Sequence, residues 1–267
     1  MKIYLIVNNF TKELIKNNFF LYKVFHYLIR NLPFIFKKLI HPHEHEYYIL
    51  KYLKKKKIKI LDIGGGYGES IISFYNINKE IAVDTYEPNN SNYHYCLKLK
   101  KKYKNLNVYN CAYGLNKKNN NLCIPVINNY RLDNLSGFNK NLIIKSIKSN
   151  FNTKNIKFLK QEVRFKTNNK KYDFIKIDCE TNFFNTVKGL SNNLKQDTLI
   201  MIEFNPDLKK IYSFLKKKNI KYKCYYLKNK KLDILNNLNK KNKEKILNVI
   251  FSSNNFLKIK ANNHDFL

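Results

Sequence analysis

The chain has 267 residues, which suits one large domain or a domain with extensions, and its 44% hydrophobic content excludes wholesale disorder and a fibrous repeat. The net charge of +32 would suit a partner such as nucleic acid or an anionic membrane. Almost all of the positive charge comes from Lys, however, and Arg, which suits bidentate phosphate contacts, occurs only at Arg30, Arg131 and Arg164. We therefore interpret the charge of this basic protein as a solvated Lys-rich surface, as an A+T-rich genome would encode.

The N-terminal region, residues 1–45, is predicted to be a helical extension. Over residues 12–31 basic residues recur on one stripe of a helix, and apolar residues fall on the opposite face. We expect this face to pack on the body of the protein, and peripheral contact with an anionic membrane is the alternative. Neither a signal peptide nor a spanning helix is predicted, so we expect a cytoplasmic protein.

No metal site is predicted. The five cysteines show no CxxC and no paired spacing, which argues against a disulfide framework or a thiolate zinc site and favours a reducing, intracellular setting. His41, His43 and His45 lie too close together for a helical ligand pair, except for the first and last, and Pro42 interrupts a helix between those two. This segment is expected to be an exposed linker into a helix near Glu46.

From residue 58 onward, short apolar runs alternate with longer helical patterns, in a domain predicted to span residues 46–267. Alternation of strand and helix predicts an α/β fold with a parallel sheet covered by helices on both faces. Residues 116–170 are rich in Asn and Lys and show few clear periods, so we expect loops and a variable cap there. The predicted strands are 58–63, 81–86, 106–111, 174–178, 198–204, 222–227 and 247–251, and the predicted helices are 69–76, 91–103, 183–194 and 208–217.

Four of the seven glycines lie in one loop, at Gly64, Gly65, Gly66 and Gly68. The loop leaves a predicted strand and opens a predicted helix, where Gly permits tight turns and close approach of a ligand to the backbone. Many nucleotide sites share such a turn, so it is weak evidence alone. The Lys-Ser/Thr ending of a P-loop is missing, which disfavours ATP and GTP.

Two acids refine the choice of ligand. Asp62 precedes the glycines, and Glu87 ends the next predicted strand 25 residues later, close to the spacing of about 20 residues at which an acid meets ribose hydroxyls. An acid at position 62 suits a cofactor with positive charge, such as S-adenosylmethionine. It would lie unfavourably close to the pyrophosphate of NAD.

The sequence from about Glu46 to Phe251 resembles the FkbM-type S-adenosylmethionine-dependent methyltransferases. The resemblance implies a Rossmann-like, seven-stranded methyltransferase sheet and transfer of a methyl group to a hydroxyl, commonly on a sugar or another small molecule. It rests on ordered blocks, of which the second and fourth are the most specific: Leu61-Asp-Ile-Gly-Gly-Gly-Tyr-Gly68, Tyr86-Glu-Pro-Asn89, Asn110-Cys-Ala-Tyr-Gly114, Asp173-Phe-Ile-Lys-Ile-Asp-Cys-Glu180, Val187-Lys-Gly-Leu190 and Ile202-Glu203.

The resemblance also implies roles for single residues. Asp62 and the glycines of the loop would shape the methionine side of the cofactor pocket, and Glu87 would hold the ribose. Pro88 and Asn89 would flank the ribose and adenine, and Ala112 would lie near adenine.

Three residues of the fourth block are candidates for chemistry. Lys176 and Asp178 lie two apart on a predicted strand and therefore point to the same side, either as a structural ion pair or as part of the active site. Asp178 or Glu180, at the carboxyl end of that strand, could act as general base toward a hydroxyl. Paired carboxylates could alternatively hold Mg²⁺, and no feature of the sequence decides between these roles.

The family continues its Lys-Ile-Asp-x-Glu block with Gly-x-Glu, whereas this chain has Thr181-Asn182-Phe183. The second acid is missing, and Glu203 at the end of the following strand is a possible replacement. The leading hypothesis is an O-methyltransferase acting on a sugar, glycan or other small molecule. An RNA methyltransferase that docks through the basic surface, or an inactive cofactor-binding scaffold, are the alternatives.

Overall fold

The computed structural model describes residues 20, 21, 24, 27, 44–53, 55–115, 120–150, 153, 155–179, 182–218, 222–228, 231–235 and 246–252. Most of the predicted helix at 12–31 therefore lies outside the described residues. Of its described side chains, Phe20, Val24 and Tyr27 are exposed. In the described part of the chain, no helix has both the length and the apolar character needed to cross a bilayer.

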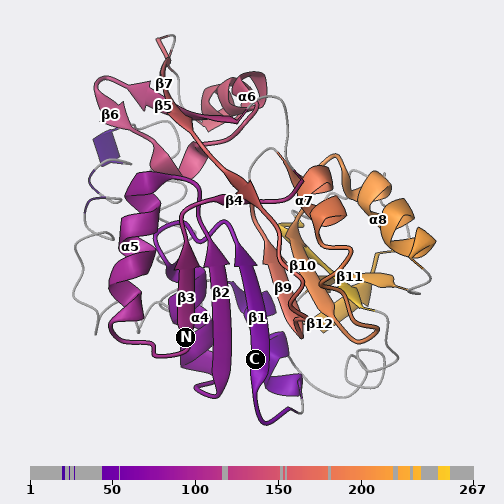
Figure 1. The fold of residues 1–267 in the computed structure, drawn as a ribbon. Helices are drawn as coiled ribbons and strands as arrows, with labels where there is room; N and C mark the ends of the chain where they lie inside the picture. The colour runs from indigo at the N-terminus through magenta and orange to yellow at the C-terminus, as the bar shows by residue number, and fades with distance from the viewer. Residues whose placement is uncertain are drawn as a thin grey trace.

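A central sheet organises the molecule (Figure 1), with the strand order β12-β11-β13-β10-β9-β1-β2-β3. β1, β2, β3, β9 and β10 run parallel, whereas β13 is antiparallel to both β10 and β11. All seven predicted strands are present, and β12, which pairs antiparallel with β11, adds an eighth. The strands are β1 (Ile58–Ile63), β2 (Ile81–Tyr86), β3 (Leu106–Tyr109), β9 (Phe174–Ile177), β10 (Leu199–Glu203), β11 (Lys223–Lys228), β12 (Lys231–Ile234) and β13 (Asn248–Ser252).

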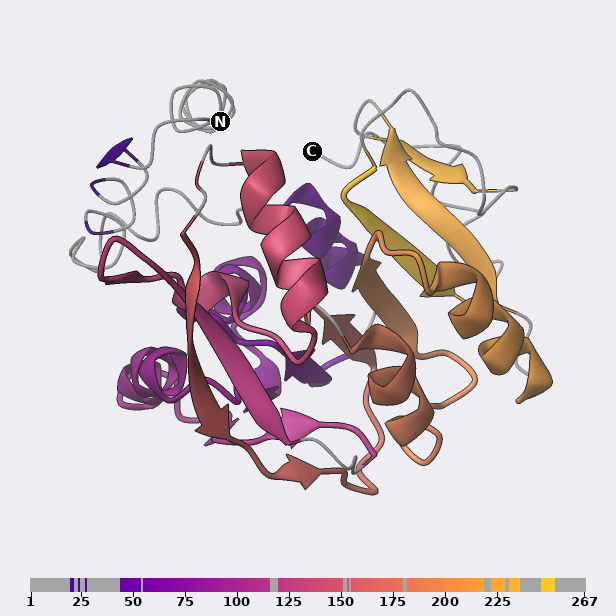
Figure 2. The same cartoon turned by 90° about the horizontal axis from the view of Figure 1, so that it is seen from above.

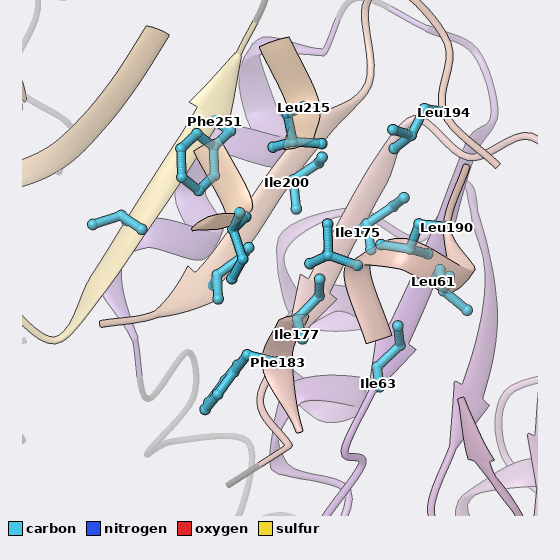
Figure 3. Packing of buried hydrophobic residues seen from close by; sticks show 14 of the residues in the cluster. Leu61, Ile63, Ile175, Ile177, Phe183, Leu190, Leu194, Ile200, Leu215 and Phe251 are labelled. Atoms are coloured by element: carbon cyan, nitrogen blue, oxygen red, sulfur yellow. The ribbon is translucent and has the colours of Figure 1, made fainter. Parts of the chain in front are cut away.

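Helices cover both faces of the sheet, as predicted. Because side chains alternate along a strand, Leu61 and Ile63 of β1 join one apolar cluster while Ile58 and Ile60 join the other. Figure 3 shows part of the first cluster, where Phe183 packs among sheet side chains. α7 (Phe183–Gly189) and α8 (Leu208–Lys217) contribute to this cluster, and the short 3-10 helix η1 (His45–Tyr52), α4 (Glu69–Ile77) and α5 (Asn90–Lys100) contribute to the other.

The strand order reverses beside β1. The chain passes from β1 to β2 and β3 on one side, and later returns to β9 and β10 on the other side. In open α/β sheets, ligands bind at such a switch point, outside the carboxyl ends of the strands. A ligand site is therefore expected at the loops that follow β1, β2 and β9.

The described residues within 120–162 form a cap with regular structure, where the sequence predicts loops and a variable cap. The cap lies over the carboxyl ends of the sheet (Figures 1 and 2). It has its own small core of Ile127, Leu132, Ile143 and Ile147. A parallel pair of short strands, β4 (Ala112–Tyr113) and β8 (Phe165–Lys166), flanks it in the chain. Its elements are β5 (Asn121–Ile127), β6 (Tyr130–Arg131), η2 (Asp133–Leu135), α6 (Lys140–Asn150) and β7 (Lys157–Glu162).

Candidate functional site

The glycine loop connects β1 to α4 at the switch point. Gly64 has a φ of +84° and Gly66 a φ of +51°, in the left-handed region that L side chains rarely adopt. A Cβ atom at Gly64 would lie 1.7 Å from the carbonyl oxygen of Asp178, so a side chain there would collide with the end of β9. A Cβ at Gly66 would meet nothing within 4 Å. Gly64 is thus required for close packing, and Gly66 for its backbone conformation.

A cavity of about 360 Å³ lies between this loop, the ends of β2 and β9, and the cap. Most of the site residues predicted from the sequence line it: Gly64, Gly65, Gly66, Glu87, Pro88, Ala112, Lys176 and Asp178. Asp62, Gly68 and Asn89 do not line it, and Glu180 and Thr181 lie outside the described residues.

Glu87 is buried at the end of β2 and held in place by the backbone. Its Oε2 accepts a hydrogen bond from the N–H of Gly66 at 2.7 Å, and its Oε1 accepts one from the N–H of Asn89 at 2.8 Å. Burial raises the pKa of Glu87 to about 7, although both of these hydrogen bonds oppose the rise. Because a carboxylate has about four lone-pair positions, each oxygen retains the capacity to accept one more hydrogen bond from a ligand.

Asp62 is completely buried behind the glycine loop, where its carboxylate contacts other side chains of the protein and does not line the cavity. Its Oδ2 accepts hydrogen bonds from Ser70 Oγ at 2.8 Å and Thr85 Oγ1 at 3.2 Å. Its Oδ1 lies 3.6 Å from Lys176 Nζ. The sequence predicts it at the cofactor pocket, but its position on the α4 face of β1 turns it toward Ser70 and Lys176 instead.

Lys176 ties together the two strands that form the switch point. The register of β1 and β9 places it opposite Asp62, and its Nζ also lies 3.2 Å from Asp178 Oδ2. The same Nζ donates a hydrogen bond to the carbonyl oxygen of Gly64 at 2.8 Å. Burial opposes the charge of Lys176, but Asp178 and Asp62 outweigh this effect and raise its pKa. Lys176 therefore stays protonated near neutral pH and holds the glycine loop against the end of β9.

Asp178 combines two properties expected of a reactive carboxylate. It lines the cavity at the carboxyl end of β9, and 42% of its side chain is exposed although its partner Lys176 is buried. Glu203, the possible replacement for the missing acid, ends β10 and does not line the cavity. Glu203 is exposed at the end of β10, yet desolvation by the surrounding protein, together with the charges of Asp178 and Glu44, raises its pKa to about 7. Among the described residues, no group of three or more His, Cys, Asp or Glu side chains could hold a metal ion.

Asn89 has a different position from the predicted one, because it joins the cap to the sheet. Its Oδ1 accepts a hydrogen bond from the N–H of Ser91 at 2.9 Å, which caps α5. Its Nδ2 donates to Asp133 Oδ1 of the cap at 3.0 Å. A second link is formed by Gln161 Nε2 of β7, which donates to the carbonyl oxygen of Pro88 at 2.6 Å. The segment that carries Glu87 is thereby fixed to the cap.

The cap supplies a wall of the cavity that the sequence does not predict. Its contribution comes from η2 and the loop after it, and residues of α7 and the preceding loop complete the opposite end. One local signal was available: Asn128 and Asn129, both with positive φ, form the two-residue turn of the β5–β6 hairpin. The wall residues not predicted from the sequence include Tyr113, Asp133, Asn134, Leu135, Ser136, Gly137, Phe138, Cys179, Asn182 and Thr186.

No family model matches this chain, and no curated protein matches it in sequence, so membership of the FkbM family stays a prediction. Several solved structures are similar in fold. A precorrin-6y C5,15-methyltransferase from Geobacter metallireducens is 12% identical, with 78% of this chain and 86% of that chain covered and a TM-score of 0.41. A predicted O-methyltransferase from Agrobacterium tumefaciens is 8% identical, with coverage of 77% and 78% and a TM-score of 0.42. Aeropyrum pernix fibrillarin, with natively bound S-adenosyl-L-methionine, is 9% identical, with coverage of 77% and 73% and a TM-score of 0.40. At these identities and TM-scores, the likenesses carry no argument about the reaction of this chain.

Proposed function

We propose that the chain is an S-adenosylmethionine-dependent methyltransferase that methylates a hydroxyl of a sugar, glycan or other small molecule. The observation that carries this proposal is the arrangement of three features along one cavity: the glycine loop, the buried carboxyl of Glu87, and the exposed carboxylate of Asp178. The sequence blocks that resemble the FkbM family supply these same three features. All three features line the same cavity, so one ligand can contact them together.

The residues present fit this cofactor. Glu87 is preorganised by two backbone N–H groups and has lone pairs left for the two ribose hydroxyls. The bare backbone of Gly64, Gly65 and Gly66 lines the cavity and permits close approach of the methionine portion. Asp178 places negative charge at the end where the sulfonium would lie. When bound, the cofactor supplies an electrophilic methyl group.

Asp178 is the proposed general base. It would accept a hydrogen bond from the acceptor hydroxyl and take its proton while the hydroxyl oxygen bonds to the methyl carbon. The bond between that carbon and the cofactor sulfur would break in the same step, and S-adenosylhomocysteine would leave as the second product. Lys176 serves as a positioning residue, since it fixes both Asp178 and the carbonyl oxygen of Gly64. The proton then leaves to solvent through the exposed part of the Asp178 side chain.

The test is transfer of a labelled methyl group from S-adenosylmethionine to fractionated cell extract, with small-molecule, glycan and RNA fractions assayed separately. The wild type is expected to label a small-molecule or glycan fraction, and Asp178→Asn to reduce the rate by about 10²–10⁴-fold, as for loss of a general base, while it still binds the cofactor. Asp197→Asn is the matched control, because Asp197 does not line the cavity and its side chain, 45% exposed, pairs with Lys55. Labelling of RNA alone, or binding without transfer to any fraction, would contradict the proposal.

A further inference from the structure

Two asparagines of the cavity wall have amide oxygens that lack a hydrogen-bond partner among the described residues. Asn92, on the first turn of α5, is 2% exposed, and Asn134 belongs to η2 of the cap. Both line the cavity. Within the part of the chain that the structure describes, neither Asn92 Oδ1 nor Asn134 Oδ1 has a hydrogen-bond partner, and both oxygens are buried. Buried polar groups in native proteins are nearly always hydrogen-bonded, so two such acceptors on one cavity wall require an explanation.

The orientation of the Asn92 amide follows from its contacts. Asn92 Nδ2 donates a hydrogen bond to the carbonyl oxygen of Asp133 at 3.4 Å. If the amide were turned over, its oxygen would face that carbonyl oxygen, with two acceptors opposed. Oδ1 is therefore the atom left without a partner, and the group that completes it must be a donor.

The place of these oxygens along the cavity indicates which part of a ligand they meet. In the sheet, Asp178 follows β9 and Glu87 follows β2, with β1 between these two strands. Asn92 lies on α5, which begins after Glu87, and α5 contacts η2, which carries Asn134. A ligand that extends from Asp178 past Glu87 would bring its base, and not its methionine, to the two asparagines.

We propose that Asn92 and Asn134 accept the two hydrogen bonds of the exocyclic amino group of adenine, and so select a 6-aminopurine over a 6-oxopurine. This inference rests on the proposed function, since it concerns the base of the same cofactor. An amino group has two N–H donors, which matches two acceptors without partners. A 6-oxo group would place a third acceptor against them and leave all three unpaired. Asn134, one of the two residues that would bind the base, belongs to the cap, and the hydrogen bond between Asn89 and Asp133 joins the cap to the sheet.

Calorimetric titration of the full chain with S-adenosylhomocysteine and with S-inosylhomocysteine, its 6-oxo counterpart, tests the inference. The wild type is expected to bind the adenosyl compound at least about 100-fold more tightly, as sites built to hydrogen-bond a ligand group discriminate against analogues that lack it. Asn134→Ala should reduce this preference by about 10-fold or more. Asn141→Ala, on the exposed side of α6, should leave it unchanged.

The outcomes separate the inference from the proposed function. Equal binding of both compounds by the wild type, or an Asn134→Ala variant that is folded by circular dichroism and keeps the full preference, would overturn the inference and leave the proposed function standing. Absence of binding of either compound would overturn both.

Discussion

The replacement Glu87→Gln tests the site most specifically, because Glu87 is both preorganised and close to its titration point. At pH 8 the wild-type carboxyl is mostly ionised, since its pKa is about 7. Gln replaces two charge-assisted hydrogen bonds from ribose hydroxyls with weaker neutral ones, and its amide NH₂ opposes the N–H of Gly66 or Asn89. With charged hydrogen bonds worth about 1.5–3 kcal/mol, we expect affinity for S-adenosylmethionine to fall by about 10–100-fold.

The pH dependence of this loss follows from the same pKa. If ribose hydroxyls bind the ionised form, wild-type affinity falls by about tenfold from pH 8 to pH 6, since only about one molecule in ten is then ionised at Glu87 in the free protein. The Gln variant lacks this titration, so the ratio of wild-type to variant affinity should shrink by about tenfold. Any titration of the cofactor itself cancels in that ratio.

The raised pKa of Glu87 also makes the stability of the folded protein depend on pH. Burial raises the pKa of Glu87 above its value of 4.5 in an exposed chain, so the free folded protein loses stability as pH rises from about 4.5 to about 7. A ligand that binds the ionised form returns this stability. Isothermal calorimetry at pH 6 and 8, with buffers of different ionisation enthalpy, measures both affinity and proton release. The same pH dependence in wild type and Glu87→Gln, or unchanged affinity at pH 8, would refute the role of Glu87.

Three further outcomes are expected. Gly64→Ala should lower the free energy of unfolding by about 3 kcal/mol or more and abolish cofactor binding, because the new Cβ collides with the Asp178 carbonyl oxygen. Gly66→Ala meets no such collision, and its positive φ alone should lower the free energy of unfolding by about 1–2 kcal/mol, measured by urea unfolding. Lys176→Met should lower the free energy of unfolding by about 3–5 kcal/mol at pH 8, because the buried carboxylate of Asp62 loses the cation that balances its charge. The loss should be smaller at pH 5, where protonation of Asp62 can remove that charge. An equal loss at both pH values would contradict this. RNA affinity, measured by filter binding from 50 to 200 mM salt, should show no preference between RNA sequences, because we interpret the lysines as a solvated surface; tight, salt-steep binding to one RNA would contradict it.

The main sheet could be predicted from local pattern. Strands such as β1, β2, β9, β10 and β13 are short apolar runs rich in Ile, Val, Leu or Phe, and this pattern is decided within a few residues of chain. The glycine loop at Gly64 could be recognised because the chain has only seven glycines, and four of them lie in this loop. Glu87 was identifiable from its position at the end of the strand that follows.

The helices and strands within the cap, and the contacts of Asp62 and Asn89, could not be predicted in this way. Asn89 and Asp133 are 44 residues apart in the chain, and nothing in the Asn-Lys-rich segment between them indicates that they bond. Asp62 was predicted at the cofactor because it precedes the glycines. Its partner across the sheet, Lys176, follows from the register of β1 and β9, which sequence spacing does not show. Contacts between distant segments thus decided which of the predicted polar residues face the cavity and which face the protein.

The electrostatic character of the site differs from that of the whole chain. The molecule carries a net charge of +32, yet Asp178 and Glu87 line the cavity with Lys176 as the cation that pairs with Asp178. A cavity with this balance suits a ligand with positive charge near Asp178 and hydroxyl donors near Glu87. It does not favour a phosphate beside Asp178.

The central claim is that this cavity binds S-adenosylmethionine, and calorimetric titration of the purified full chain with that cofactor at pH 8 tests it most directly. One cofactor per chain is predicted, with affinity that falls at least about tenfold in Glu87→Gln and is unchanged in Asp197→Asn. No binding heat and no thermal stabilisation at millimolar cofactor, from a protein with a cooperative unfolding transition, would contradict the account.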